Sequence, residues 1–83
     1  MPMYYFNILN HGERIEDKEG AELPDFDAAR EEALASARDL VSEAVKAGHH
    51  PSDLVDGIEI VDADRRTLTV VPIAAVLNGK GAH

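Results

Sequence analysis

The chain contains no cysteine and no tryptophan among its 83 residues. Without thiols it can form neither disulfide bonds nor thiolate zinc sites, so packing or association with another chain has to stabilise it. Basic residues are also scarce, since 8 Lys and Arg stand against 16 Asp and Glu, for a formal net charge of −8. That charge repels nucleic-acid phosphates and anionic lipid head groups, so we expect neither nucleic acid nor a membrane among the direct partners.

Long apolar runs and a basic leader are missing as well. The opening residues, MPMYYFNILN, carry no basic segment, and no window approaches the roughly 20 apolar residues that a transmembrane helix needs. We therefore expect a cytoplasmic protein. Its length fits a single domain over residues 1–79, followed by a flexible C-terminal tail at residues 80–83.

Residues 25–47 carry the strongest pattern in the chain. Apolar residues recur there at steps of three and four, which predicts one long amphipathic helix. Asp25 is suited to the N-cap, and Gly48 can supply the left-handed residue that ends the helix. Small side chains dominate the apolar stripe, which should therefore pack closely on a sheet: Ala29, Ala33, Ala37 and Ala44, with Phe26 and Leu40.

Alternating apolar residues predict strands on both sides of this helix. Residues 3–9 form the first strand, a tight turn follows at residues 10–13, and residues 14–16 make a short return strand. Residues 57–62 and 66–71 read as a hairpin whose Ile58, Ile60, Leu68 and Val70 face the helix. Leu54 and Val55 fill the end of the core, and residues 73–77 form a helical turn that Asn78 and Gly79 end.

The predicted fold class is therefore α+β, with the element order β-β-α-β-β. An antiparallel sheet of three to four strands carries the long helix on one face, because the hydrophobic period changes from two to 3.6 and back.

Several stretches together resemble a known family. They are P-M-Y-Y-F-N-I at residues 2–8, D-K-E-G-A-E-L-P-D at 17–25, A-A-R-E-E-A at 28–33 and T-V-V-P-I at 69–73. This combination resembles a family of short bacterial proteins that is described only as a domain of unknown function. The resemblance covers nearly the whole chain and implies no catalytic residues. Such sequences often carry a glycine where this chain has Arg65.

A looser resemblance concerns the first strand, the hairpin and the segment E-E-A-L-A-S-A-R at residues 31–38. These features are similar to HicB-like antitoxins, small acidic proteins that bind a basic toxin. The resemblance implies a basic partner protein. Much of the pattern is shared by any amphipathic helix that packs on a sheet.

The histidines are the candidate metal ligands. His49, His50 and Asp53, with His11 as a further ligand, could bind zinc or nickel. The alternative is that adjacent histidines at a helix C-terminus interact with its free carbonyl groups and its dipole. Because the pair lacks the i, i+4 spacing of helical metal sites, we expect no metal and no other cofactor.

The acidic residues between positions 13 and 27 allow three readings. They could bind calcium, but Gly20 is misplaced for an EF-hand loop and no glutamate closes the loop at its twelfth position. They could also form a solvated surface, or meet a basic partner. The aromatic residues of the first strand could stack on bases, but without basic neighbours they fit a core or an interface better.

Enzymatic function has little support in the sequence. Ser36, Ser42 and Ser52 stand outside any nucleophile elbow, although a small enzyme using histidine and carboxylate groups stays an alternative. The leading hypothesis is a non-enzymatic protein-interaction or regulatory module that forms a homodimer. Its expected interface lies on the sheet face opposite the helix and comprises Met3, Tyr5, Leu9, Val61 and Val71, because that apolar surface needs a cover. The alternative is that the turn at residues 73–77 folds back and covers this face of the monomer.

Overall fold

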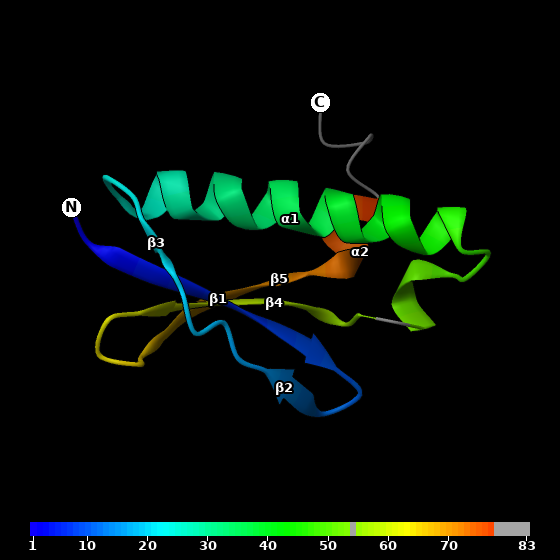
Figure 1. The fold of residues 1–83 in the computed structure, drawn as a ribbon, viewed down its shortest axis with the longest axis horizontal. Helices are drawn as coiled ribbons and strands as arrows, with labels where there is room; N and C mark the ends of the chain where they lie inside the picture. Colours follow the sequence, from blue (N-terminus) through cyan, green and yellow to red (C-terminus); the bar gives the residue numbers. More distant parts are fainter. Residues whose placement is uncertain (54, 78–83) are drawn as a thin grey trace.

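One antiparallel sheet and one long helix form the two layers of the molecule (Figure 1). The computed structural model describes residues 1–53 and 55–77, so Leu54, the predicted stop at Asn78 and Gly79, and the predicted tail at residues 80–83 lie outside the described residues. The elements in chain order are β1 (Met3–Asn10), β2 (Glu13–Ile15), β3 (Ala21–Glu22), α1 (Phe26–Lys46), η1 (Pro51–Asp53), β4 (Gly57–Asp62), β5 (Thr67–Pro72) and α2 (Ile73–Leu77).

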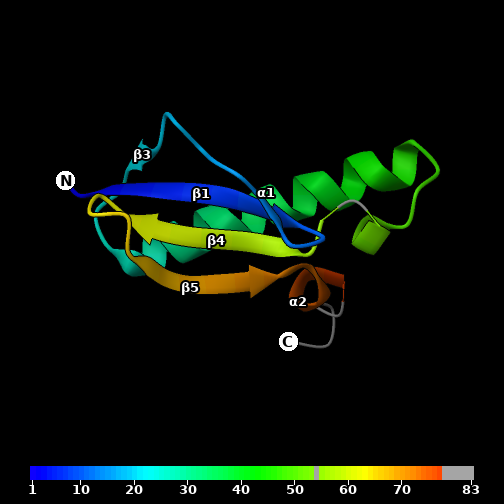
Figure 2. The same cartoon turned by 90° about the horizontal axis from the view of Figure 1, so that it is seen from below.

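The strands are arranged in the order β2-β1-β4-β5, and the short β3 pairs with the beginning of β1. Every pairing is antiparallel. Figure 2 shows β1, β4 and β5 side by side, with α1 behind them. The predicted α+β class is confirmed. The sheet has one strand more than expected, because the two-residue β3 is too short to leave a periodic pattern in the sequence.

Two tight turns give the hairpins their register. His11 and Gly12 both have positive φ, of 52° and 82°, as a type I′ turn between β1 and β2 requires. In the β4–β5 turn, the Arg65 N–H donates to the Asp62 carbonyl over 3.0 Å, and Arg65 itself has a φ of 68°. Glycine adopts this left-handed conformation without strain, whereas a residue with a side chain such as Arg65 rarely does.

Both ends of α1 follow the prediction. The Asp25 carboxylate accepts a hydrogen bond of 2.9 Å from the Ala28 N–H, which makes Asp25 the N-cap. At the other end Gly48 has a φ of 83°, and the His49 N–H donates to the Ala44 carbonyl over 2.9 Å. This is the Schellman arrangement, in which a glycine ends the helix.

The core lies between α1 and the helix-facing side of the sheet. Ala29, Ala33 and Ala37 are fully buried, and Ile58 and Ile60 of β4 are the largest fully buried side chains. Alanine has the smallest side chain that still favours a helix, so the stripe lets α1 approach the sheet closely. The other buried members of this cluster are Tyr4, Val55, Val71 and Ile73.

The predicted orientation of β5 is wrong for Val70 and Val71, whereas Leu68 lies on the helix side with Phe26, as predicted. Val71 lies opposite Ile58 and belongs to the helix-side core, whereas Val70 lies opposite Glu59 on the other face. The reason is a β-bulge: Ile60 pairs with Thr69 and Val61 with Thr67, so Leu68 is an extra residue in the ladder. Because side chains alternate between the two faces of a sheet, one inserted residue moves each later side chain of the strand to the opposite face. Val71 therefore does not lie on the face where the predicted interface placed it.

The helical turn α2 is confirmed, and it packs on the helix side of the sheet. Ile73 is buried in the core cluster, and Val76 and Leu77 pack against that cluster. The turn therefore adds to the core and leaves the opposite face of the sheet, here called the open face, without a helical cover among the described residues. None of the helices in residues 1–53 and 55–77 has the length and apolar character needed to cross a membrane.

Candidate functional site

A buried carboxylate lies at the centre of the open face. Glu59 of β4 is only 4% exposed, although no helix covers it in the described part of the chain. Its Oε1 accepts a hydrogen bond from Asn7 Nδ2 over 3.1 Å and forms an ion pair with Arg14 Nε over 2.8 Å, while Arg14 Nη2 donates to Oε2 over 3.3 Å. Its Oε2 accepts from Thr67 Oγ1 over 2.6 Å. Three strands besides β4 supply these donors, so the network joins the whole width of the sheet.

Hydrogen bonds set the protonation state of this carboxylate. Burial alone would raise the pKa of Glu59, but the bonds from Thr67 and Asn7 and the positive charge of Arg14 outweigh it and lower that pKa below its ordinary value. The side chain is therefore ionised at neutral pH. Since protein donors occupy both of its oxygens, Glu59 serves as an anchor for the sheet and is poorly placed to accept a proton from a substrate.

Asp17 closes a gap in the sheet edge beside β1. Because β2 and β3 pair with the two ends of β1, the N–H of Phe6 in the middle has no strand opposite it. The Asp17 carboxylate accepts from that N–H over 3.1 Å, and the Asp17 N–H donates to Asn7 Oδ1 over 2.9 Å. The carboxylate thus replaces the missing strand at this point.

The rest of the D-K-E-G segment, residues 17–20, folds around the Asp17 carboxylate. Asp17 Oδ1 also accepts from the N–H groups of Glu19 and Gly20, over 3.0 and 3.1 Å. Burial tends to raise the pKa of Asp17, but the bonds from Gly20, Phe6 and Glu19 together lower that pKa below the ordinary value. One member of the acidic stretch is therefore structural. The neighbouring Glu16, Lys18, Glu19 and Glu22 are exposed.

Four of the five predicted interface residues share the open face. Tyr5 lies opposite Val61, and Leu9 lies opposite Gly57. Val61 is buried, and the others are half-buried. The buried polar side chains of Asn7 and Glu59 separate Leu9 from the rest, so these residues do not form one continuous apolar surface. Their role as an interface stays a prediction.

Tyr5 is partly covered by the chain itself. The Arg65 guanidinium lies over its ring, 4.9 Å from the centroid, in a cation–π contact. Gly20 approaches the ring so closely that a Cβ at this position would lie 2.8 Å from Tyr5 Cε2. Two loops distant in sequence therefore meet on this aromatic side chain.

The candidate metal ligands do not converge. His50 Nδ1 lies 2.7 Å from Ser52 Oγ, and His11 Nε2 lies 3.1 Å from the carbonyl oxygen of Asp53. The carboxylate of Asp56, not that of Asp53, accepts from the His11 N–H. Nowhere in residues 1–53 and 55–77 do three side chains of the ligand types lie together as a metal site requires.

The two edges of the sheet differ in character. On the β1 side, Glu13 and Arg14 charge the three-residue β2, and Asp17 closes the gap beside it. On the other side, β5 pairs only with β4 among the described strands. Residues 67–77 contain no charged side chain. Charges on an edge strand normally prevent pairing with other chains, so β5 is the less protected edge.

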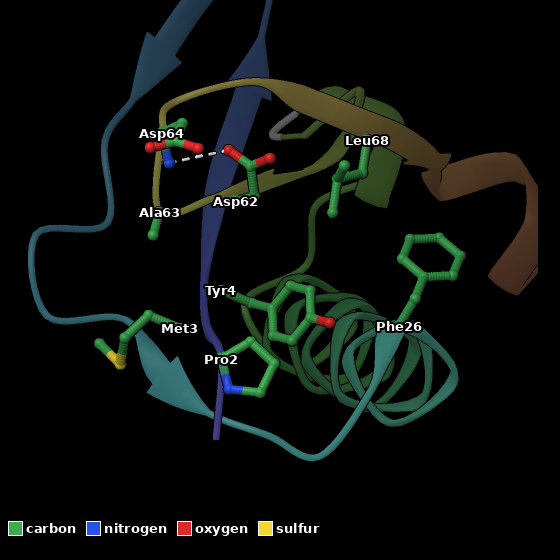
Figure 3. Close-up of a pocket in the computed structure, with 8 residues that line it drawn as sticks. All are labelled: Pro2, Met3, Tyr4, Phe26, Asp62, Ala63, Asp64 and Leu68. Carbon is green, nitrogen blue, oxygen red and sulfur yellow. Dashed lines mark hydrogen bonds between the residues drawn. The ribbon is translucent and has the colours of Figure 1, made fainter.

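Exposed apolar side chains lie on both faces of the sheet near this edge. Val70 is 44% exposed on the open face, and Leu68, at 42%, lies on the helix side with Phe26 of α1, at 37%. We call these three residues the β5 patch, although it is divided between the two faces. Leu68 and Phe26 line a cleft of about 610 Å³ together with Pro2, Met3, Tyr4, Asp62, Ala63 and Asp64 (Figure 3). Figure 3 shows that residues from β1, α1 and the β4–β5 hairpin meet around it. The cleft lies between the first turn of α1 and the bulge in β5.

Sequence reasoning missed both Glu59 and the β5 patch. A single acid inside the apolar run GIEIVD was the available signal for Glu59, because a charge in a central strand needs partners. For the β5 patch, the sequence shows that residues 67–77 carry no charge. It does not show the bulge that places Val70 on the open face, because no particular residue type marks this bulge.

The fold and these sites define a small two-layer α+β domain with a buried polar anchor and one uncharged edge strand. A family model described as "Domain of unknown function (DUF6894)" matches residues 3–74, and the chain belongs to that family. The predicted membership in a family of unknown function is thus confirmed. Searches of curated proteins and of solved structures found no match, so the resemblance to HicB-like antitoxins stays a prediction.

Proposed function

We propose that the protein is a non-enzymatic interaction module, and that two copies associate through the edge strand β5. The observation that carries this proposal is the coincidence of an uncharged edge, which pairs with no further strand in the described part of the chain, with the exposed β5 patch. Unpaired backbone groups on such an edge can continue the sheet into another chain, and the neighbouring apolar side chains add burial to the contact.

The charge of the protein favours this surface over the others. Two copies with a net charge of −8 repel each other, so they can associate only where few negative charges come together. Helix α1 carries Asp and Glu along its outer face, and β2 is charged as well. Residues 67–77 are free of charge, and pairing β5 with itself brings no like charges into contact.

The size of the core supports association too. Among residues 1–53 and 55–77, Ile58 and Ile60 are the only large side chains with less than 2% exposure, because alanine fills most of the helix side of the core. A domain of this length buries a smaller share of its unfolded surface than a larger domain does, and dimerisation is a common way to bury more.

Light scattering after size exclusion at micromolar concentration tests the proposal. We expect a mass near twice the 9.0 kDa of one chain. Val70→Lys should reduce it to that of a monomer, because a lysine on an edge strand blocks strand pairing. Val45→Lys is the matched control, since Val45 is 62% exposed on α1 and lies away from the edge.

Each outcome of this experiment is informative. A wild-type mass of one chain at these concentrations would overturn self-association. A Val70→Lys protein that stays dimeric would leave self-association standing and exclude β5 as its surface. Loss of the dimer in Val45→Lys alone would place the contact on α1.

A further inference from the structure

We infer that the β5 strands of two copies pair antiparallel about a two-fold axis at Val70, so that α2 of each copy closes the Phe26–Leu68 cleft of the other. This inference rests on the proposed self-association and adds its register. It follows from three features: the direction of the backbone groups, the position of the bulge, and the place of α2 in the fold.

Backbone direction shows which residues of β5 face the free edge. The Ile73 N–H donates to the Asp56 carbonyl over 2.8 Å, so this opposite pair is hydrogen-bonded. Antiparallel ladders alternate, hence Val71 and Thr69 also bond to β4, opposite Ile58 and Ile60. Val70 and Pro72 therefore direct their backbone groups away from β4. Val70 offers both a donor and an acceptor to a second chain, whereas Pro72 has no N–H to offer.

The bulge and the proline limit the register. Leu68 is the inserted residue and lines the cleft with Tyr4 and Phe26 on the helix side, so regular alternation begins only after it. Pro72 ends the regular stretch on the other side. The middle of the remaining residues 69–71 is Val70. An axis there sets Val70 against its own copy on the open face and Thr69 against Val71 on the helix side, so every pair shares a face.

This register brings the second copy's α2 to the cleft. Antiparallel pairing about Val70 places Leu68 opposite Pro72 of the other chain, and α2 begins directly after Pro72. In each copy α2 follows the C-terminal end of β5 (Figure 2) and packs on the helix side. The cleft lies beside Leu68, towards the other end of β5. The two-fold axis exchanges these ends, so the exposed Ala74 and Ala75 of one copy come to lie beside Leu68 and Phe26 of the other. All three members of the β5 patch are then covered.

Disulfide cross-linking of variants with a single cysteine tests this register directly, because the natural chain contains no cysteine. Opposite residues in a hydrogen-bonded antiparallel pair have Cα atoms about 5.5 Å apart, a distance that a disulfide spans. Val70→Cys should therefore form a covalent dimer readily under mild oxidation. Leu68→Cys is the control on the same strand, since its two copies would be separated by four residues, about 14 Å along the strand. We expect its cross-linking to be at least about tenfold slower.

The closed cleft is tested by Phe26→Ala. Removing a phenylalanine that the second copy covers should weaken dimerisation by at least about tenfold. Val45→Ala, an exposed apolar residue on the same helix, should leave the dissociation constant unchanged.

The outcomes separate the register from the proposed function. A dimeric mass with Leu68→Cys cross-linking faster than Val70→Cys, or with neither cross-linking, overturns the Val70 axis while self-association stands. Rapid Val70→Cys cross-linking with unchanged affinity in Phe26→Ala supports the axis and overturns closure of the cleft by α2. A monomeric mass for the natural chain overturns the register and the proposed function together.

Discussion

Single residues on the open face hold elements together that have little core of their own. Glu59 joins the strands through Asn7, Arg14 and Thr67, and Asp17 satisfies the N–H of Phe6 where no strand lies opposite. Both carboxylates act as acceptors for several donors. Such side chains stabilise the folded protein only while they are ionised.

Acid should therefore destabilise the protein through Glu59 and Asp17. The pKa of each is lower in the folded protein than in the unfolded chain, from ordinary values of 4.5 and 3.8. Their contribution is complete above the unfolded pKa and is lost as the pH falls through the folded pKa, because the unfolded state then binds more protons. We expect the free energy of unfolding, from urea titrations, to decrease steeply below about pH 5.

Glu59→Gln provides the control for this pH dependence, since glutamine cannot titrate. Its free energy of unfolding should be lower at pH 7 and should vary less between pH 5 and pH 3. Equal slopes in the natural protein and the variant would contradict the assigned role of Glu59.

Gly20 is predicted to be intolerant of any side chain. It has a φ of 70°, and a Cβ would lie 2.8 Å from the Tyr5 ring and 2.9 Å from Met3 Cε. Gly20→Ala thus combines backbone strain with a steric clash, and we expect a loss of about 2–4 kcal/mol. Gly12→Ala has a similar φ of 82° but no atom within 4 Å, so strain alone should cost about 1 kcal/mol. Equal urea midpoints for the two variants would show that the Tyr5 contact is unimportant.

At the scale of elements, α1 depends on its alanine stripe. Ala33 is fully buried against the sheet, whereas the adjacent Glu32 is exposed. Ala33→Asp places an unpaired charge in the core and should unfold the protein, while Glu32→Ala should change the free energy of unfolding by less than about 0.5 kcal/mol. Circular dichroism and urea titration measure both. Two folded variants of equal stability would refute the assigned face of the helix.

The elements that the sequence predicted well have local causes. Asp25 and Gly48 define the ends of α1 through their own hydrogen bonds and dihedral angles, and Asn10 to Glu13 make a turn whose type depends on His11 and Gly12. Each of these signals lies within a few residues of the structure that it specifies. This is why helix, first hairpin and fold class could be predicted from the residues alone.

The features that the sequence predicted wrongly, or did not predict, depend on interactions between segments that are distant in the chain. Val71 was assigned to the wrong face because the bulge at Leu68 results from the pairing of β5 with β4, not from a residue preference. Asn7 bonds to Glu59, which lies 52 residues away in the chain, and to Asp17, which lies 10 residues away. No periodic pattern in the sequence connects these residues. His49 and His50 are neighbours in sequence but have different partners in the fold. The His49 N–H donates to the Ala44 carbonyl, and His50 Nδ1 lies beside Ser52 Oγ.

At the scale of the whole molecule, the asymmetry of the two sheet edges is the feature that most needs explanation. The β2 edge has charges and a carboxylate that closes its gap, whereas β5 has neither. The apolar side chains of Phe26, Leu68 and Val70 lie beside the unprotected edge. The proposed association of two copies there would account for both facts, and it would let a small, acidic domain without disulfides gain additional buried surface.

Backbone amide exchange of Val70, followed by NMR as a function of protein concentration, tests this account most directly. The Val70 N–H faces away from β4, so only a second chain can protect it from exchange within the described sheet. The account predicts protection at concentrations where the mass is that of a dimer, and loss of protection on dilution to the monomer. Val71, which bonds to β4 in either state, should stay protected throughout. A Val70 amide that exchanges freely in the concentrated sample, beside a protected Val71, would contradict pairing through β5.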